Sequence, residues 1–296
     1  MNLGAQNVQF GCPMNKPNST NSIYCSRVSI RCSYSSVSSL PYQSLRCAVL
    51  GAGFAGLSVT WHLLQHSPKD MHLHIDMYDE VGIGGGASGV SGGLLHPYSP
   101  KVKPLWHAVD CWKRSLDLLT VAEDAHSSKC LSVGRQVQSQ DTSSSIVRRR
   151  GILRPATSMK NLDLMNDNAQ SSLASCRIES ICEDAVEKLV PNLRLPLGMG
   201  FYMPEAVNIH PQRYLEGLYL ACENLKNGGA DGVASNRDFC LHKERVDSLQ
   251  ELAREYDTVI ICLGARAAFS PELSGKLPLR TCRGVVAHLQ LDDDTR

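Results

Sequence analysis

Residues 47–56, CAVLGAGFAG, decide the fold, because they place three glycines as G-x-G-x-x-G directly after an apolar strand and directly before a helix. In this arrangement Gly51 permits the tight strand-to-helix turn, Gly53 lets the backbone approach a pyrophosphate, and Gly56 lets the helix pack closely on the strand. The phosphates then sit on unpaired N–H groups at the positive end of the helix dipole. The pattern is typical of a dinucleotide-binding turn, although glycine-rich turns also occur where they serve only packing.

The residues that follow the glycines favour the binding role. Residues 73–78, LHIDMY, alternate as a second strand that ends at Asp79 and Glu80. An acid at this point, roughly 20 residues beyond the glycines, can accept hydrogen bonds from a ribose 2′-OH. We choose Asp79 first and Glu80 second, because the acid should close the strand; the alternative is a pair of solvated loop carboxylates. The helix between the two strands is indicated by apolar residues at helical spacing, Leu57, Trp61 and Leu64.

The next segment indicates which dinucleotide is bound. In a nicotinamide-binding domain the second strand normally leads through another helix to a third strand. Here it leads into residues 81–95, VGIGGGASGVSGGLL, which are too rich in glycine to be helical. A long glycine loop beside a nucleotide site favours close backbone approach to a large, flat ligand. The alternatives are a flexible surface loop and a nicotinamide-dependent dehydrogenase.

At this point the chain resembles the FAD-dependent oxidoreductases of the D-amino-acid oxidase superfamily. Residues 84–93, GGGASGVSGG, are similar to the family's second loop, in which Ser88 and its neighbours line the flavin side of FAD. Residues 256–265, YDTVIICLGA, resemble the late strand that brings Gly264 near the cofactor, and residues 243–249, KERVDSL, the segment whose valine packs by the adenine. The motif and the resemblance together give the candidate cofactor-binding residues Gly51, Ala52, Gly53, Phe54, Ala55, Gly56, Asp79, Glu80, Ala87, Ser88, Gly89, Val246 and Gly264.

Within that superfamily the chain is most similar to the flavin oxidase domain of bacterial enzymes of the MnmC type, which modify the tRNA wobble uridine. This likeness rests on residues 87–98, 149–156, 198–211 and 277–289, which fall in that family's order. It implies oxidative removal of a carboxymethyl group from carboxymethylaminomethyl uridine, which is oxidation at a C–N bond. The expected substrate is therefore a small-molecule amine or a modified tRNA nucleoside.

In such a reaction the flavin carries most of the chemistry, while the protein positions the amine and excludes water. The amine must be neutral to give up hydride, so a group of the protein or the solvent takes its proton. His96, Tyr98 and Arg283 lie in segments that can face the substrate, with Arg283 as a partner for a carboxylate. Because each is equally an ordinary loop or surface residue, we assign no catalytic residue.

The sequence predicts an α/β protein in which a Rossmann-like FAD-binding domain is interleaved with an α+β substrate domain. On the superfamily pattern, residues 47–130 and 205–275 form the FAD-binding domain, whereas residues 131–204 and 276–296 belong to the substrate domain. Apolar periodicity predicts helices at 105–122, 184–190 and 212–225 and strands at 149–153, 258–263 and 284–289. The run at 258–263 is continuously apolar, as expected for a parallel strand covered on both faces.

The resemblance also implies a C-terminal truncation. Family members continue beyond the strand at 284–289 and supply a late glycine-containing segment that holds the flavin ring, whereas this sequence ends at LDDDTR. We therefore expect weak FAD retention. The alternative to an active enzyme is a non-catalytic remnant that binds at most the adenosine diphosphate half of FAD.

The first 46 residues have the composition of a transit peptide. They hold ten serines and four basic residues but no Asp or Glu, the first acid being Asp70. A hydroxylated, acid-free leader with little apolar periodicity favours the chloroplast over the mitochondrion. The alternative is a disordered tail on a cytoplasmic protein.

Composition excludes several function classes. With 43% hydrophobic residues among 296, the chain can bury a sizeable core, yet no apolar stretch approaches the roughly 20 residues needed to cross a bilayer. Without the four leader bases, 26 basic residues face 29 acidic ones, so there is no strong electrostatic signature of nucleic-acid binding. The exception is a short basic cluster, which we interpret mainly as a solvated strand end: Arg148, Arg149, Arg150 and Arg154.

The twelve cysteines do not predict a metal site, because no two of them stand as C-x-x-C. We interpret them as reduced structural thiols. Nothing in the sequence indicates an oligomeric state.

Overall fold

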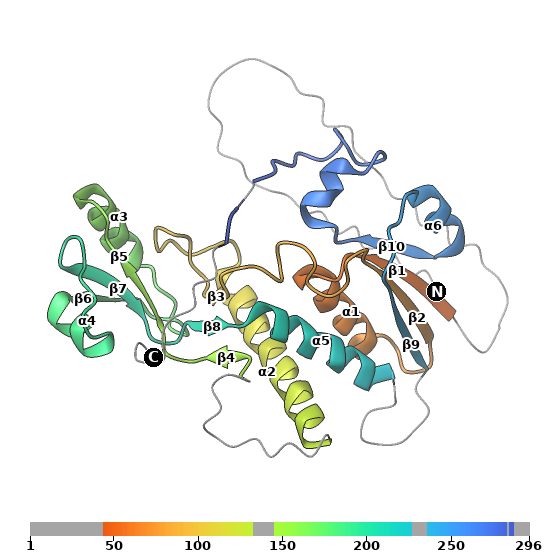
Figure 1. Ribbon diagram of the computed structural model, residues 1–296, viewed down its shortest axis with the longest axis horizontal. Coiled ribbons are helices and arrows are strands. Elements are labelled where there is room, and N and C mark those ends of the chain that lie inside the picture. The colour runs from red at the N-terminus through yellow and green to blue at the C-terminus, as the bar shows by residue number, and fades with distance from the viewer. Residues whose placement is uncertain (1–43, 133–144, 227–235, 283, 287–296) are drawn as a thin grey trace, which may run out of the picture. The chain divides into compact units, whose positions relative to one another are not determined.

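A four-stranded parallel sheet forms around the strand of the glycine motif (Figure 1). The computed structural model describes residues 44–132, 145–226, 236–282 and 284–286. In it β1 (Ser44–Leu50) pairs on one side with β10 (Thr258–Ile261) and on the other with β2 (His72–Tyr78), and β9 (Arg237–His242) lies beyond β2. The strand order β10-β1-β2-β9 gives the α/β fold with a parallel sheet that the sequence predicts.

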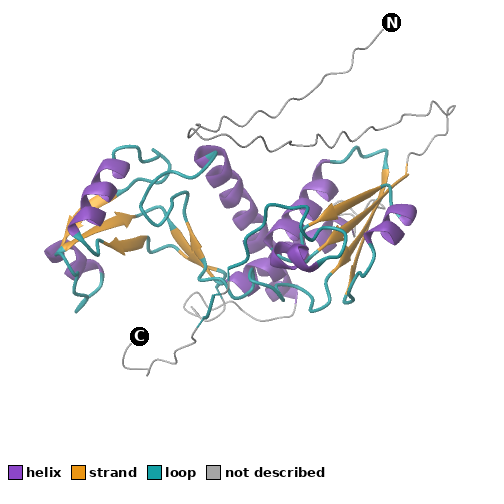
Figure 2. Ribbon diagram, turned by 90° about the horizontal axis from the view of Figure 1, so that it is seen from above, coloured by secondary structure: helices purple, strands orange, loops and turns teal. Residues whose placement is uncertain are grey.

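Two helices, α1 (Phe54–His66) and α5 (Pro211–Lys226), cover one face of this sheet and contact its strands. They pack against each other, and α2 (Ala108–Ser132) packs against α5. The sheet meets them with alternate side chains of β2, namely Leu73, Ile75 and Met77, which are fully buried. On the opposite face α6 (Leu249–Glu255) contributes Leu252 against Ala48 and Leu50, so that the sheet lies between α6 and the other helices (Figure 2).

The remaining described strands form two small antiparallel sheets, and a 3-10 helix, η2 (Gly264–Phe269), follows β10. One consists of β3 (Leu94–Leu95), β8 (Val207–Ile209) and β4 (Val147–Arg148), and the other of β5 (Ile152–Pro155), β7 (Met199–Met203) and β6 (Glu179–Cys182). The second sheet carries α3 (Met159–Ala169), which the Ser158 hydroxyl caps, and α4 (Glu183–Leu189). Its core is formed by Phe201 and Met203 of β7 together with residues of α3 and α2.

The predicted elements around the glycine motif are confirmed, with differences in their bounds. The first strand begins at Ser44, inside the segment predicted as a leader, because Ser44–Arg46 pair with β2. The helices predicted at 184–190 and 212–225 are α4 and α5. Residues 1–43 of the predicted leader lie outside the described residues.

Three predicted elements need correction. The helix predicted from residue 105 begins at Ala108 as α2, and the side chains of Leu105 and Val109 are 52% and 63% exposed instead of buried. Of the strand predicted at 149–153, only residues 152 and 153 lie in a strand, β5, whereas residues 149–151 connect β4 to β5, and Gly151 turns the chain there with a φ of +72°. Residues 284–286 form no strand, and 287–289 lie outside the described part.

The strand predicted to be covered on both faces is instead an edge strand. Among the described strands β10 pairs only with β1; it ends at Ile261 rather than at residue 263, and Ile261 is 41% exposed. A continuous apolar run indicates a strand but does not fix its place in the sheet.

Two findings bear on the chemistry of the chain. Eight cysteines are free thiols: Cys47, Cys111, Cys176, Cys182, Cys222, Cys240, Cys262 and Cys282. Across the described residues no helix combines the length and the apolar character needed to span a bilayer.

Candidate cofactor-binding site

The turn between β1 and α1 leaves no room for a side chain at two of its glycines. Gly51 has a φ of +108°, and a Cβ there would lie 2.5 Å from the carbonyl oxygen of Cys262, just beyond β10. A Cβ on Gly56 would lie 1.8 Å from the carbonyl oxygen of Gly51. These two glycines therefore let α1 and the residues after β10 pack directly against the turn.

Gly53 faces a side chain, whereas Gly51 and Gly56 face backbone atoms. A Cβ there would meet only the Ser88 side chain, with Oγ at 2.8 Å, and the same Oγ accepts a hydrogen bond from Phe54 N–H at 3.2 Å. The other N–H groups of the first turn, at Gly53, Ala55 and Gly56, have no acceptor within the helix. The absence of a side chain at Gly53 therefore leaves a space beside Ser88 at the positive end of α1. A diphosphate in this space can accept hydrogen bonds from the N–H groups of Gly53, Ala55 and Gly56.

Asp79 follows β2 and fixes the turn. Its Oδ2 accepts a hydrogen bond from Ala52 N–H at 2.9 Å, and its Oδ1 accepts from the N–H groups of Val81 at 3.0 Å and Gly82 at 2.9 Å. Since a carboxylate oxygen offers two lone pairs, Oδ1 is filled and Oδ2 retains one. Asp79 can therefore accept one ribose hydroxyl while it holds the glycine turn. The second choice, Glu80, forms an ion pair with Arg266.

The second glycine loop is docked against the first turn. Gly84 N–H donates to the Ala52 carbonyl at 3.0 Å, and the Gln212 side-chain amide donates to the Ile83 carbonyl at 3.1 Å. A Cβ on Gly89 would lie 2.1 Å from the Gly84 carbonyl oxygen, which shows how tightly the loop folds on itself. The structure thus places Ala87, Ser88 and Gly89 in a loop held beside the start of α1, contrary to the alternative of a flexible surface loop.

Val246 and Gly264 follow the two edge strands of the sheet. Val246 comes after β9 and packs, partly buried, against the cluster that contains Leu50. Gly264 comes after β10 with a φ of +55°, and a Cβ there would meet nothing within 4 Å. Because all four strands are parallel, their carboxyl ends share one edge with Gly51 and Asp79, which is where ligands bind in open α/β sheets. The predicted cofactor residues are therefore gathered at one edge.

These residues fit FAD. The N–H groups of Gly53 and Ala55 would hold the diphosphate, Asp79 would hold the ribose, and Ser88 and its neighbours would approach the flavin half. When bound, FAD supplies the hydride acceptor that no side chain can provide.

A second polar group lies beyond β3, where Arg154 of β5 contacts His96. Arg154 Nη2 is 2.9 Å from His96 Nε2, while Tyr98 N–H donates to His96 Nδ1 at 3.2 Å. Arg154 Nε is buried and has no hydrogen-bond partner among the described residues. Burial, reinforced by the positive charge of Arg154, lowers the pKa of His96 to about 4, so this imidazole is neutral at pH 7.

Sequence reasoning missed the role of Arg154, which it grouped with the basic cluster. That cluster does not form one surface, because Arg149 forms a bidentate pair with Glu123 at 2.9 and 2.6 Å, whereas Arg154 turns inward to His96. A signal was present: Arg154 stands two residues after Ile152, which is buried, and alternation in a strand places both on the same face.

Two other residues, Tyr98 and Arg283, lie in segments that the sequence analysis placed near the substrate. Tyr98 is buried, and its hydroxyl donates to the Cys176 carbonyl and accepts from Leu173 N–H at 2.8 Å, which makes it a structural residue. Arg283 lies outside the described residues.

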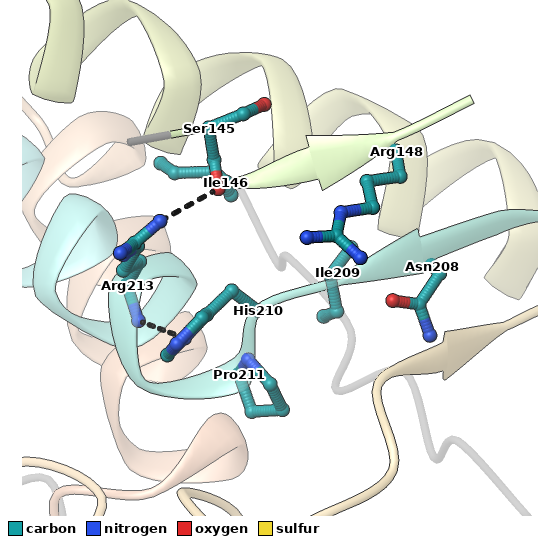
Figure 3. A pocket seen from close by; sticks show the side chains of 8 residues that line it. All are labelled: Ser145, Ile146, Arg148, Asn208, Ile209, His210, Pro211 and Arg213. Carbon is teal, nitrogen blue, oxygen red and sulfur yellow. Dashed lines mark hydrogen bonds between the residues drawn. The ribbon is translucent and has the colours of Figure 1, made fainter. Parts of the chain in front are cut away.

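A separate hollow of about 180 Å³ lies between β4, β8 and the start of α5 (Figure 3). Its lining includes Arg148 of β4 and Arg213 of α5, and Arg213 donates to the Ser145 carbonyl at 3.3 Å. It adjoins the end of the second glycine loop through the Ile209 N–H to Gly93 carbonyl bond of 2.8 Å. Its lining does not include the residues of the glycine turn.

Comparison with known proteins agrees with this geometry. The profile of the family described as "DAO: FAD dependent oxidoreductase" matches residues 46–296. The chain belongs to this family. This confirms the prediction of an FAD-dependent oxidoreductase with FAD as its cofactor; the closer likeness to the MnmC type stays a prediction.

Individual relatives are distant. A candidate thiamine biosynthesis oxidoreductase, ThiO, from Rhizobium etli is 24% identical over 242 residues, which are 81% of this chain and 59% of the relative. Glycine oxidase from Geobacillus kaustophilus matches with a TM-score of 0.52 at 14% identity, over 79% of this chain and 59% of that one. L-proline dehydrogenase from P. horikoshii gives the same TM-score and identity, over 80% and 57%. The two structures support the fold, and the chain spans somewhat more than half the length of these proteins.

The pKa of His96 predicts how stability depends on pH. The pKa is about 4 in the folded protein and 6.5 for an ordinary histidine, so between these values the unfolded chain binds a proton that the folded chain does not. Stability contributed by the neutral imidazole is therefore lost as the pH falls from 6.5 toward 4, by up to about 3 kcal/mol. Urea unfolding at a series of pH values, compared with His96→Gln, measures this. Parallel pH profiles for the two proteins would contradict the assignment.

Proposed function

We propose that the protein is an FAD-dependent amine oxidase or dehydrogenase whose substrates carry a carboxylate beside the amine. Family membership and the glycine cradle support the flavin chemistry. The observation that carries the substrate class is the partly buried guanidinium of Arg154, with its buried and unpartnered Nε, beside the neutral His96.

The hydrogen-bond inventory of this pair leaves donors without acceptors. A neutral imidazole has one lone pair, yet His96 is approached by two donors, Tyr98 N–H and Arg154 Nη2. Only one of them is satisfied, and Arg154 Nε has no partner at all. The Nε and Nη2 groups form one side of the guanidinium fork, which matches the two oxygens of a carboxylate. A bound carboxylate would satisfy both, after a shift of the groups that cover Nε.

The chemistry proposed for the site divides between cofactor and protein. Loss of a hydride from the carbon next to the neutral amine nitrogen, for which FAD would be the acceptor, together with loss of the N–H proton gives an imine. Water then converts the imine to a carbonyl compound and releases ammonia from a free amino acid or an amine from an N-substituted glycine. The residues of the chain would orient the substrate through Arg154 and hold a neutral imidazole beside it. The proton that the ammonium group must lose before oxidation goes to solvent, because a pKa of about 4 is too low for the His96 imidazole to take it at neutral pH.

The substrate class includes free amino acids and N-substituted glycines. The carboxymethylaminomethyl group of the tRNA wobble uridine, implied by the likeness to the MnmC type, presents the same carboxylate and amine. Anaerobic incubation of the FAD-loaded protein with glycine, N-methylglycine or the modified nucleoside, followed by flavin bleaching, distinguishes these sources. A colourless protein that FAD does not stabilise would contradict the enzyme and favour a non-catalytic remnant.

Replacing Arg154 by methionine should remove the preference for a free carboxylate. We expect kcat/KM for the acid to fall by about 100-fold or more, because two charge-assisted hydrogen bonds are lost, while kcat/KM for the corresponding methyl ester changes little. The acid-to-ester ratio, measured by flavin bleaching or by peroxide release, is the readout.

Arg149→Met is the matched control, since Arg149 pairs with Glu123 at the surface and should leave the ratio unchanged. Melting curves of both variants show whether the fold is retained. An Arg154→Met protein that is folded and still prefers the acid would exclude Arg154 as the carboxylate partner.

A further inference from the structure

The outer face of the parallel sheet carries an unusual group of polar residues. In β2 and β9 the side chains alternate, so that the residues between the buried apolar ones point to the face opposite α1 and α5. Neighbouring positions of the two strands are in register, which brings their side chains together. The pairs are His74 with Asp238, Asp76 with Cys240, and Tyr78 with His242.

Asp76 is the centre of this group. Its side chain is 8% exposed, and its oxygens accept hydrogen bonds from His242 Nε2 at 2.6 Å, His74 Nε2 at 2.7 Å and the Tyr256 hydroxyl at 2.8 Å. Burial acts to raise the pKa of Asp76, but these hydrogen bonds outweigh it and hold the pKa below its ordinary value. A buried carboxylate therefore stays ionised on the outer face of the sheet, with imidazole groups against both of its oxygens.

We propose that Asp76, Cys240 and His242 bind one divalent metal ion of the zinc type. One ligand atom from each, a carboxylate oxygen, the sulfur and an imidazole nitrogen, lies within 4.8 Å of the other two. Tetrahedral zinc with bonds of about 2.0–2.3 Å places its ligand atoms roughly 3.4–3.6 Å apart. Small side-chain rotations reach that spacing: the carboxylate–imidazole contact of 2.6 Å opens as the ion replaces the proton, and the sulfur moves inward.

The ligand types select the ion. A thiolate with an imidazole and a carboxylate suits zinc and similar transition metals, whereas magnesium and calcium prefer oxygen alone. Cys240 is exposed, so an ion can reach the group from solvent, and three protein ligands leave a fourth position for water. His74 would remain outside the ligand set, where its hydrogen bonds to Asp76 and to Asp238 at 2.8 Å hold the carboxylate in place.

Such an ion would tie the edge strand β9 to β2. His242 is the last residue of β9, and the segment that contains Val246 follows it, so the site would also fix the start of a segment predicted to lie by the adenine. A C-x-x-C pattern does not reveal this group, because Cys240 and His242 stand as C-x-H in one strand and Asp76 comes from another.

Metal binding by the whole chain tests the proposal. After treatment with a chelator and desalting, the protein is titrated with Zn²⁺ in competition with a chromophoric chelator, and we expect one ion bound per chain. Cys240→Ser and His242→Gln should each lower the affinity for Zn²⁺ by at least about 100-fold. Loss of a residue that only orients a metal ligand costs about 10–100-fold, so loss of a ligand itself is expected at or above the upper end of that range. Cys111→Ala, which removes an exposed thiol on α2, should change nothing.

Co²⁺ gives an independent readout. A thiolate-to-cobalt absorption band, recorded as a difference spectrum, should appear in the unaltered protein and in Cys111→Ala but not in Cys240→Ser. Melting curves establish that the variants are folded. Zn²⁺ binding that is absent, or that is equally tight in Cys240→Ser, overturns the proposal, and neither result depends on catalytic activity.

Discussion

Replacing Gly53 by valine is expected to lower the affinity for FAD by at least about 100-fold while the fold is retained. Gly53 has an extended φ of −92° and ψ of −166°, which valine adopts without strain, and its added Cβ would meet only the mobile end of the Ser88 side chain. The isopropyl group would occupy the space at the first turn of α1 and displace a diphosphate from two or more N–H groups. Charge-assisted hydrogen bonds contribute about 1.5–3 kcal/mol each, which gives the expected factor.

The measurement is a titration of flavin-free protein with FAD, followed by quenching of flavin fluorescence. Valine at a helix N-cap is poorer than glycine, so the free energy of unfolding without FAD should fall by no more than about 1 kcal/mol. Ser127→Val is the control: it introduces the same side chain at an exposed position of α2, far from Gly53 in the sequence, and should leave FAD affinity unchanged. If Gly53→Val binds FAD with unchanged affinity, the diphosphate does not bind at this turn.

The parts of the site that the sequence predicted are those encoded by neighbouring residues. The strand, the turn, the helix and the closing acid follow one another from Cys47 to Asp79, and each has a local pattern. By contrast, the pairing of His96 with Arg154 joins the residue after β3 to a residue of β5, and the group at Asp76 joins two strands far apart in the chain. No spacing along the sequence reports such contacts.

Periodicity also did not tell which apolar residues are covered. Leu105 and Val109 have the spacing of a buried helix face, but the chain reaches α2 only at Ala108, and both side chains are exposed. Likewise the apolar run of β10 has the composition of a central strand but stands at the sheet edge. Coverage depends on which elements pack together, a tertiary property that composition does not contain.

Replacing Gly56 by alanine should instead act on the fold itself, and we expect the free energy of unfolding to fall by about 3–5 kcal/mol. The added Cβ would lie 1.8 Å from the Gly51 carbonyl oxygen and 3.0 Å from its carbon, and backbone atoms cannot rotate away as a side chain can. Relief requires α1 to move off β1, which would open the contact of Leu57 with the buried face of the sheet. Overpacking of this kind costs 1–3 kcal/mol and more where the backbone must shift.

Urea unfolding of the flavin-free protein, monitored by circular dichroism, measures the change. Gly86→Ala is the matched control, because a Cβ there meets nothing within 4 Å and no positive φ is involved, so stability should stay within about 0.5 kcal/mol. Together with Gly53→Val, the pair separates two roles within one motif: Gly56 acts through packing of α1 on β1, and Gly53 through access to the cofactor. Equal stability of Gly56→Ala and Gly86→Ala would mean that α1 does not approach the turn as closely as the structure places it.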